Sequence, residues 1–527
     1  MLTACALLYS AAVASGAERP YLREADEIAT LRQGWTEDAR AKVREKWAGY
    51  LALTDEQLWA LPPGPAVYRA MGVNQTEGCP KCGKAAYDVG GLWPFKCDIL
   101  NKPWKVTCPS CGALFPTNDF AAFYHSGLDS RGYFIPGQAD RSLLLNPEHP
   151  ADDDPLHAWG VDDGTGWVDD KGNRFWFIAR YCGTLWTQLT RDARAMAEDY
   201  QRTGEPRLAH VVGILMARMA DIHPDLNFTE QGVHPGDYKL GRDEGKAIWA
   251  CGPYSEAARM RDLLATYDDI WEPIGADAQL VEFLTARSAQ IGRPEWAGSA
   301  DAVRRHIESE LILEGARDVM RSRGKGSQRY GGDVGHMEWT LALQGLVVDD
   351  PELKAELLAW PFQGPFPLKG GMHEVLCGAI LGREGAGGSS SPGYSKTHYT
   401  MARTLADIYG RLEGPEHRDL YALYPAIKHS YDSQFLLNCC EKYSPNIGDS
   451  SSCGSPGLAC NANTMLEAFA RFGEPRHARM AYFLNKHSTR GFPEQVAAQV
   501  QAIVDEQGDW EQTATNLNGY GLSILRS

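Results

Sequence analysis

The chain of 527 residues lacks several features that would place it in a class at once. Beyond the first residues, no stretch approaches the roughly 20 apolar residues that a membrane-spanning helix needs. Basic side chains are in the minority, since Lys+Arg 52 stand against Asp+Glu 68 and give a formal net charge of −16. An acidic protein of this kind is a poor non-specific binder of nucleic acid or anionic membranes, although one cleft can still be locally basic. A fixed sequence period is also missing, which disfavours a solenoid of short repeats.

The composition that is present indicates an ordinary folded protein. Hydrophobic residues make up 43% and charged residues 23%, which disfavours a disordered or fibrous chain. The length is typical of about three domains, or of fewer if one is a large helical ring or barrel. The 15 Trp and 22 Tyr are a heavy aromatic content that fits core packing and sugar-stacking platforms equally well.

The N-terminal segment is typical of a secretory signal. Residues 1–17 carry no charge, are mostly apolar and are followed by the charged pair Glu18–Arg19. Ala12–Ala14 or Ser15–Ala17 supplies the small residues of a cleavage site, although the usual basic start is missing. Leu2–Cys5 also resembles a lipoprotein box, which would give a lipid anchor, and a buried N-terminal helix is the structural alternative. We expect a periplasmic or secreted protein.

Four of the 13 cysteines have the spacing of a metal site. Cys79 and Cys82, and then Cys108 and Cys111, form two near-identical Cys-Pro-x-Cys-Gly turns, here called knuckles. Two such turns present four thiolates to one ion, so we expect a structural zinc site with no open position for substrate. Two disulfides are the alternative in an exported protein. The other cysteines, among them Cys439–Cys440, Cys453 and Cys460, show no metal spacing and are interpreted as core residues or disulfides.

Helical periodicity dominates from about residue 178 to 501. It predicts a helix pair around the turn Thr203-Gly204-Glu205-Pro206, which combines a stop signal with a new start. The predicted helices are Leu185–Arg202, Leu208–Ile222, Ser255–Ile270, Ala278–Ile291, Ser299–Arg321, Met337–Val348, Glu352–Trp360, Pro392–Leu412, Arg418–Tyr431, Asn463–Phe472, Arg476–Leu484 and Pro493–Asp505. Helix pairs without convincing strands between them favour an all-α fold, and a closed ring of helical hairpins accommodates them in one domain.

The chain divides accordingly into five predicted segments. They are a signal segment (1–17), an N-terminal helical segment (18–75), a zinc ribbon (76–120), an (α/α) toroid (121–510) and the Gly-rich, strand-like start of a β domain (511–527).

Several segments in this order resemble the heparinase II/III superfamily of polysaccharide lyases, which includes oligoalginate lyases. The resemblance covers residues 19 to the end and rests on the opening Arg19–Leu22, the two-knuckle ribbon, Ala197–Tyr200 with Thr203–Glu205, Ser391–Tyr394 and Asn446–Ser450. It implies an (α/α) toroid followed by an antiparallel β-sandwich, of which only the toroid is expected here. It also implies β-elimination at a uronic acid, in which a carboxylate is neutralised, a base removes the C5 proton and an acid protonates O4.

The resemblance assigns roles to residues in two segments. His336 occupies the position at which the family holds the substrate carboxylate, with Glu338 close behind, and Tyr394 matches the proton-transferring tyrosine. We also assign substrate-binding roles to the following residues: His398, Tyr399, Arg329 and Asp449. The structural alternatives are a helix-capping His336 and a Tyr394 that packs at a helix start. We expect the side chains of His336 and Tyr394 to converge on one cleft lined by aromatic and basic residues.

The sequence departs from the family in ways that bear on catalysis. The family's further His or Tyr and its metal site of His and Asp come from the β-sandwich, so a second metal would belong to a domain not expected in residues 1–527. The serines Ser389–Ser391 replace the family's usual Glu. The expected function is an exported lyase of an acidic polysaccharide. The alternatives are a non-catalytic carbohydrate-binding scaffold and a glycoside hydrolase using Glu338 with Asp333 or Asp449.

Overall fold

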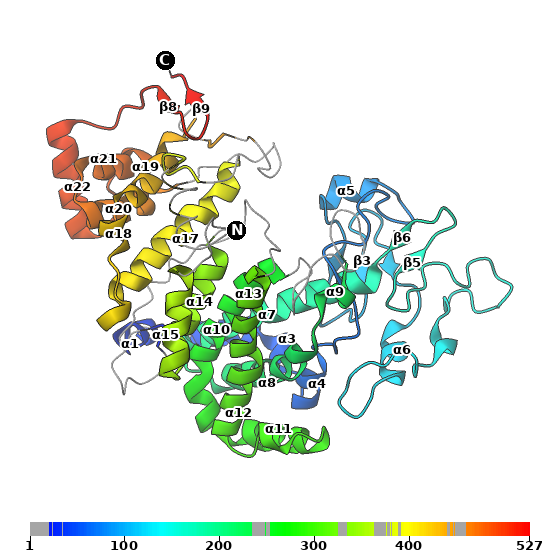
Figure 1. Ribbon diagram of the computed structural model, residues 1–527. Helices are drawn as coiled ribbons and strands as arrows, with labels where there is room; N and C mark the ends of the chain where they lie inside the picture. The colour runs from blue at the N-terminus through cyan, green and yellow to red at the C-terminus, as the bar shows by residue number, and fades with distance from the viewer. Residues whose placement is uncertain are drawn as a thin grey trace. The chain divides into compact units, whose positions relative to one another are not determined.

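Helices dominate the computed structural model of the chain (Figure 1). The structure describes residues 21–23, 25–33, 35–233, 248, 253–324, 335–362, 376, 380, 382–387, 391–439, 443–445, 447 and 460–526. The expectation of an all-α protein is confirmed at this level, since the strands are short and few beside the helices. Among the described residues, each helix is too short or too polar to cross a membrane. The predicted signal segment, residues 1–17, lies outside the described residues.

The chain forms two compact units, and the predicted segment 121–510 is shared between them. Unit 1 comprises residues 1–327 and 346–349, and unit 2 comprises residues 328–345 and 350–527.

Unit 1 contains the ribbon and the first group of helices. Its α-helices are α1 (Ala25–Arg32), α2 (Glu37–Lys46), α3 (Ala48–Leu51), α4 (Asp55–Ala60), α5 (Ala85–Gly90), α6 (Phe120–Ser126), α7 (Phe177–Thr203), α8 (Pro206–Ile222), α9 (Phe228–Gln231), α10 (Pro253–Ala276), α11 (Ala278–Gln290), α12 (Ala300–Ile307) and α13 (Glu314–Gly324). Its strands are β1 (Arg69–Ala70), β2 (Lys96–Cys97), β3 (Val106–Thr107), β4 (Leu114–Phe115), β5 (Trp167–Val168), β6 (Arg174–Phe175) and β7 (Gly232–Val233). Short 3-10 turns occupy Arg141–Leu143, His223–Asp225 and Pro294–Trp296.

The centre of unit 1 is built from three long helices. α7, α8 and α10 pack against one another and bury apolar side chains along their shared faces. The α7–α8 turn is as predicted: Gly204 ends α7 in the left-handed region (φ +69°), and Pro206 begins α8 at its first position. Glycine costs least in that conformation, and proline lacks only an N–H that a helix start leaves unbonded, so these residues fix the hairpin locally.

Two local expectations for unit 1 need correction. The predicted helix Ser299–Arg321 is interrupted by a π-helical turn at Glu308–Leu313 between α12 and α13. The helical region also contains a strand, because β7 pairs in parallel with β1 through Arg69–Gly232 and Ala70–Val233. Two residues are too few to give a periodic signal, so this strand was not predictable from the sequence pattern.

Unit 2 contains the second group of helices and a C-terminal hairpin. Its elements are α14 (His336–Val347, whose last residues belong to unit 1), α15 (Pro351–Ala359), α17 (Pro392–Arg411), α18 (Leu420–Leu423), α19 (His429–Leu436), α20 (Ala462–Phe472), α21 (Pro475–Leu484), α22 (Glu494–Gln507), β8 (Thr515–Leu517) and β9 (Leu522–Ile524). Its 3-10 turns occupy Trp360–Phe362, Gly414–Glu416 and Pro425–Lys428. The predicted helix Arg418–Tyr431 is wrong, because Pro425 begins a 3-10 turn that separates α18 from α19.

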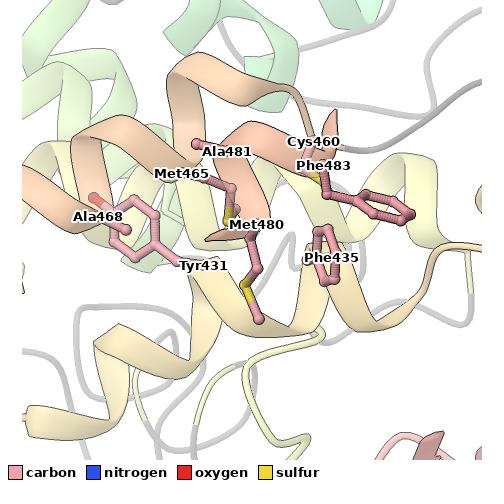
Figure 2. Close-up of a cluster of buried hydrophobic side chains, with 8 residues drawn as sticks. All are labelled: Tyr431, Phe435, Cys460, Met465, Ala468, Met480, Ala481 and Phe483. Atoms are coloured by element: carbon pink, nitrogen blue, oxygen red, sulfur yellow. The ribbon is translucent and has the colours of Figure 1, made fainter. Parts of the chain in front are cut away.

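Side chains from α19, α20 and α21, with Cys460 just before α20, form a hydrophobic core in unit 2 (Figure 2). Its buried members are Tyr431, Phe435, Cys460, Met465, Ala468, Met480, Ala481 and Phe483. α20 and α21 are joined by Gly473, Glu474 and Pro475, the same three residue types as the α7–α8 turn, and Gly473 is again left-handed (φ +66°). Both units thus use one sequence device to form a helical hairpin.

Candidate functional site

The four knuckle cysteines come together in one cluster in unit 1. Their sulfur atoms all lie within 4.8 Å of one another. The Sγ atoms of Cys79 and Cys111 are 3.8 Å apart, and those of Cys82 and Cys108 are 3.6 Å apart. A tetrahedral ion with metal–sulfur bonds of about 2.3 Å requires sulfur–sulfur distances of about 3.8 Å. The cluster therefore has the size and ligand number of a four-thiolate metal site.

Backbone hydrogen bonds give both knuckles the same shape. In the first, the N–H of Gly83 donates to the carbonyl of Cys79 over 2.8 Å, and in the second the N–H of Gly112 donates to Cys108 over 2.9 Å. Both glycines have positive φ, +63° and +73°, which other residues rarely adopt. The Cys-Pro-x-Cys-Gly sequence therefore determines the turn that aims each pair of sulfurs.

A small sheet carries the second knuckle. β3 pairs antiparallel with β2 and with β4, and Cys108 to Ala113 connect β3 to β4. The sheet is fixed to α7 because Phe115 stacks on Phe177, with ring centroids 4.6 Å apart and an interplanar angle of 8°. Two of these short strands, β2 and β3, lie between the knuckles, and β4 follows the second knuckle.

The thiols of the cluster have shifted pKa values. Burial raises the pKa of Cys79 and of Cys82. Burial acts in the same direction on Cys111, but the N–H of Ala113 and the neighbouring thiols outweigh it and lower the pKa of that residue. Thiolates are the metal-binding form, so loading the cluster with a cation would release protons.

The disulfide alternative is not what the structure contains. All four cysteines are free thiols, and the two closest sulfur contacts join one knuckle to the other instead of the two cysteines within a knuckle. A metal ion held by all four sulfurs would have no open coordination position, as in structural and unlike catalytic metal sites.

The other predicted residues that the structure describes all belong to unit 2. His336 is half-buried at the first position of α14, directly after Gly335, whose φ is +91°. Its carbonyl accepts a hydrogen bond of 2.8 Å from the Thr340 hydroxyl one turn later. Glu338 is only 2% exposed, so its carboxylate is inside the packing of the unit.

Tyr394 lies in the first turn of α17, as predicted for a helix that begins at Pro392. The helix start is closed by the N–H of Ser395, which donates to the carbonyl of Ser391 over 2.9 Å. The described residues establish the backbone position of Tyr394 but not its side chain, and Arg329, Asp333 and Asp449 lie outside them. The convergence of His336 and Tyr394 stays a prediction.

His398 and Tyr399 are buried in the next turn of α17, each 1% exposed. Tyr399 packs in a cluster with Ile380 and Ala402, and burial raises the pKa of its hydroxyl. Within the described residues that hydroxyl has no hydrogen-bond partner, while the Arg403 guanidinium lies 5.2 Å from the ring centroid.

Two residues, one inside α17 and one packed near its start, were not identified from the sequence. Arg403 lies 4.1 Å from the centroid of the Tyr431 ring. Tyr520, in the turn between β8 and β9, is 9% exposed, and burial raises its pKa against the opposing effect of Ser395. The hairpin is held by the N–H of Gly519, which donates to the Glu384 carboxylate over 3.0 Å. For Arg403, the only signal in the sequence is its place in a helical pattern of spacing. Tyr520 has no motif around it that would indicate a role.

In comparisons with known proteins, the chain matches no family model and no curated protein.

Proposed function

We propose that the chain is an exported lyase that cleaves a uronic-acid-containing polysaccharide by β-elimination, on an (α/α) toroid stabilised by zinc in the cysteine cluster. The observation that carries this proposal is that His336 and Tyr394 each stand in the first turn of a helix of unit 2, α14 and α17. A helix N-terminus favours negative charge, and the reaction builds negative charge on the carboxylate and α-carbon of the uronate.

In this proposal the two residues have different tasks. His336 binds the substrate carboxylate through a hydrogen bond that it donates, which stabilises the negative charge. Tyr394 transfers the proton, from C5 or to O4, because a phenol can serve as acid or base once its surroundings shift its pKa. The burial of His398 and Tyr399 suits positioning of the α17 start better than direct contact with a sugar.

The two alternative functions receive less support from the described residues. A glycoside hydrolase needs two carboxylates that flank an open cleft, whereas Glu338 is 2% exposed. A purely sugar-binding scaffold would not need a tyrosine at the start of α17. It can be told from a lyase by measurement, because it would bind the polysaccharide without forming product.

The direct test is incubation of the metal-loaded chain with alginate, heparan sulfate and chondroitin polymers. A lyase creates a conjugated double bond in each new non-reducing uronate, so ultraviolet absorbance should rise with time. Dextran, which has no carboxylate, is the control and should give no signal. Retention of all three polymers without any rise in absorbance would favour the sugar-binding scaffold instead.

A further inference from the structure

One arginine of unit 2 is buried without a counter-charge in contact with it. Arg403, near the middle of α17, is 8% exposed. Its Nε–H donates to the carbonyl of Tyr399, one turn earlier, over 3.3 Å. In the part of the chain that the structure describes, no carboxylate forms an ion pair with its guanidinium. An arginine cannot lose its charge in a protein, so such burial is costly unless an anion compensates it.

The acidic side chains around α17 have other partners. Asp407, one turn further along the helix, binds Arg471 over 2.6 Å and accepts a hydrogen bond of 3.2 Å from the Tyr421 hydroxyl. Glu467 of α20 accepts a hydrogen bond of 2.6 Å from the Tyr431 hydroxyl. Neither carboxylate therefore neutralises Arg403 by direct contact.

Tyrosine rings hold the Arg403 guanidinium in place. Its carbon lies 4.1 Å from the ring centroid of Tyr431 and 5.2 Å from that of Tyr399. A ring face attracts the cation but offers its N–H groups no oxygen acceptor. Among the described residues only Nε has such an acceptor, and the terminal nitrogens are not among the side-chain atoms sealed from solvent. The terminal N–H groups are thus free to bind a ligand.

The Tyr399 hydroxyl is a second unused donor on the same face of α17. Tyr399 is 1% exposed, and its hydroxyl is sealed from solvent without an acceptor in the described part of the chain. Burial raises the pKa of this hydroxyl against the opposing effect of Arg403, so the group stays protonated. Residues four apart on a helix are neighbours, so the two donors belong to one site. A buried donor is costly to leave unpaired, and both donors call for an acceptor.

We propose that Arg403 and Tyr399 form a binding site for a carboxylate group. The planar fork of guanidinium N–H groups matches the two oxygens of a carboxylate, and the Tyr399 hydroxyl donates a further hydrogen bond. The carboxylate belongs either to a small free acid such as formate or acetate, or to a uronate unit of the polysaccharide. The chemistry of both sources is the same, and only the second rests on the proposed lyase.

The test uses three variants of the full, metal-loaded chain. Arg403→Met removes the charge and the donors but keeps an apolar stem against the rings. Tyr399→Phe removes only the hydroxyl and keeps the ring beside Arg403, so it tests the site even if Arg403→Met fails to fold. Arg490→Met, at an exposed arginine of the same unit, is the control with the same change of charge.

The measurement is the NMR line width of ¹³C-labelled formate during a titration at constant ionic strength, with chloride as the replacing salt. The parent should bind formate saturably and more tightly than chloride. Arg403→Met should raise the Kd for formate by about 10- to 100-fold, because charge-assisted hydrogen bonds are lost. Tyr399→Phe should raise it by about threefold to tenfold, and Arg490→Met by less than about twofold.

Competition then separates the two sources of the carboxylate. Glucuronate and alginate oligomers are added against labelled formate, the oligomers in a Tyr394→Phe background so that they are not cleaved. Displacement of formate that disappears in Arg403→Met assigns the site to a uronate of the polysaccharide. Failure to displace formate assigns it to small free acids. Both outcomes keep the carboxylate site.

Three results would overturn the site: no saturable binding of formate by the parent, chloride binding as tight as formate binding, or equal effects of Arg403→Met and Arg490→Met. In the first case water alone satisfies the donors. The outcome is separable from the lyase proposal. Unsaturated product without formate binding would reject this site and keep the lyase, whereas formate binding without product from any polymer would do the reverse.

Discussion

In the ribbon, residues that are far apart in the sequence lie together, whereas for His336 and Tyr394 in the α14–α17 region this stays a prediction, and the two sites differ in what would assemble them. In the ribbon, each pair of cysteines is aimed by its own turn, and a hairpin between β3 and β4 brings the second turn to the first. In unit 2, His336 and Tyr394 stand in the first turns of separate helices, so their predicted convergence depends on how those helices pack. The geometry of a site built from local turns should survive substitutions elsewhere in the unit. The geometry of a site built between helices should be altered by any substitution that changes how the helices pack.

The largest effect is expected from breaking the cysteine cluster. Cys108→Ser should abolish tight metal binding and loosen residues 78–115 while α7 stays helical, because a closed four-ligand site loses a thiolate. Structural zinc is worth on the order of 10 kcal/mol in small zinc-binding folds. Metal content and hydrogen exchange of the ribbon would measure this.

Cys97→Ser is the matched control for this change. Cys97 lies in β2 of the same sheet but outside the cluster. The Cys97→Ser variant should therefore keep the metal. A Cys108→Ser protein that retains one metal per chain would contradict the assignment, as would native disulfides joining Cys79 to Cys82 and Cys108 to Cys111.

The second effect concerns Tyr394 in the α14–α17 region. Tyr394→Phe should reduce turnover by roughly 10²–10⁴-fold while binding is kept, because it removes only the oxygen that carries the proton. Tyr424→Phe, a half-buried tyrosine of the same unit, is the control and should retain activity. Equal activity of the two variants would remove Tyr394 from the mechanism.

A third, smaller effect is a pH dependence of unit 1. His306 is 6% exposed and stacks on Trp296 with ring centroids 4.2 Å apart, and burial lowers its pKa to about 4. Since the unfolded chain binds this proton near pH 6.5, stability is lost as the pH falls from about 6.5 to about 4 and then levels off.

The loss is at most about 3 kcal/mol by proton linkage. His306→Gln should flatten this part of the profile of thermal midpoint against pH. If the thermal midpoints of wild type and variant fall in parallel between pH 7 and pH 4, His306 does not titrate in this way.

The smallest effect compares the two hairpin turns directly. Gly204→Ala and Gly473→Ala should each cost about 1 kcal/mol, because a Cβ there meets no atom within 4 Å but the backbone is left-handed. Gly410→Ala, inside α17 with equally open space, should be neutral or stabilising. Denaturant unfolding would measure all three, and similar losses at Gly410 and Gly204 would mean that φ is not the cause.

Prediction from the sequence succeeded where a few neighbouring residues define a conformation. The Gly-Glu-Pro turns, the start of α17 at Pro392 and the four-cysteine cluster each follow from such a run. The predicted helix Arg418–Tyr431 is wrong because Pro425 removes a backbone donor inside the segment, and apolar spacing does not register that loss. The identity of the metal, the toroid and the lyase activity stay proposals.

The local turns and their side-chain chemistry follow from short runs of sequence: two knuckles that each aim two sulfurs, and helix starts that carry His336 and Tyr394. Which of these groups are accessible depends on the packing of distant segments. It buries Glu338, His398 and Tyr399, and brings Tyr520 to the start of α17. The physical reason is one of range: a turn is fixed by backbone hydrogen bonds among a few neighbours, whereas burial depends on which distant segments pack over a side chain.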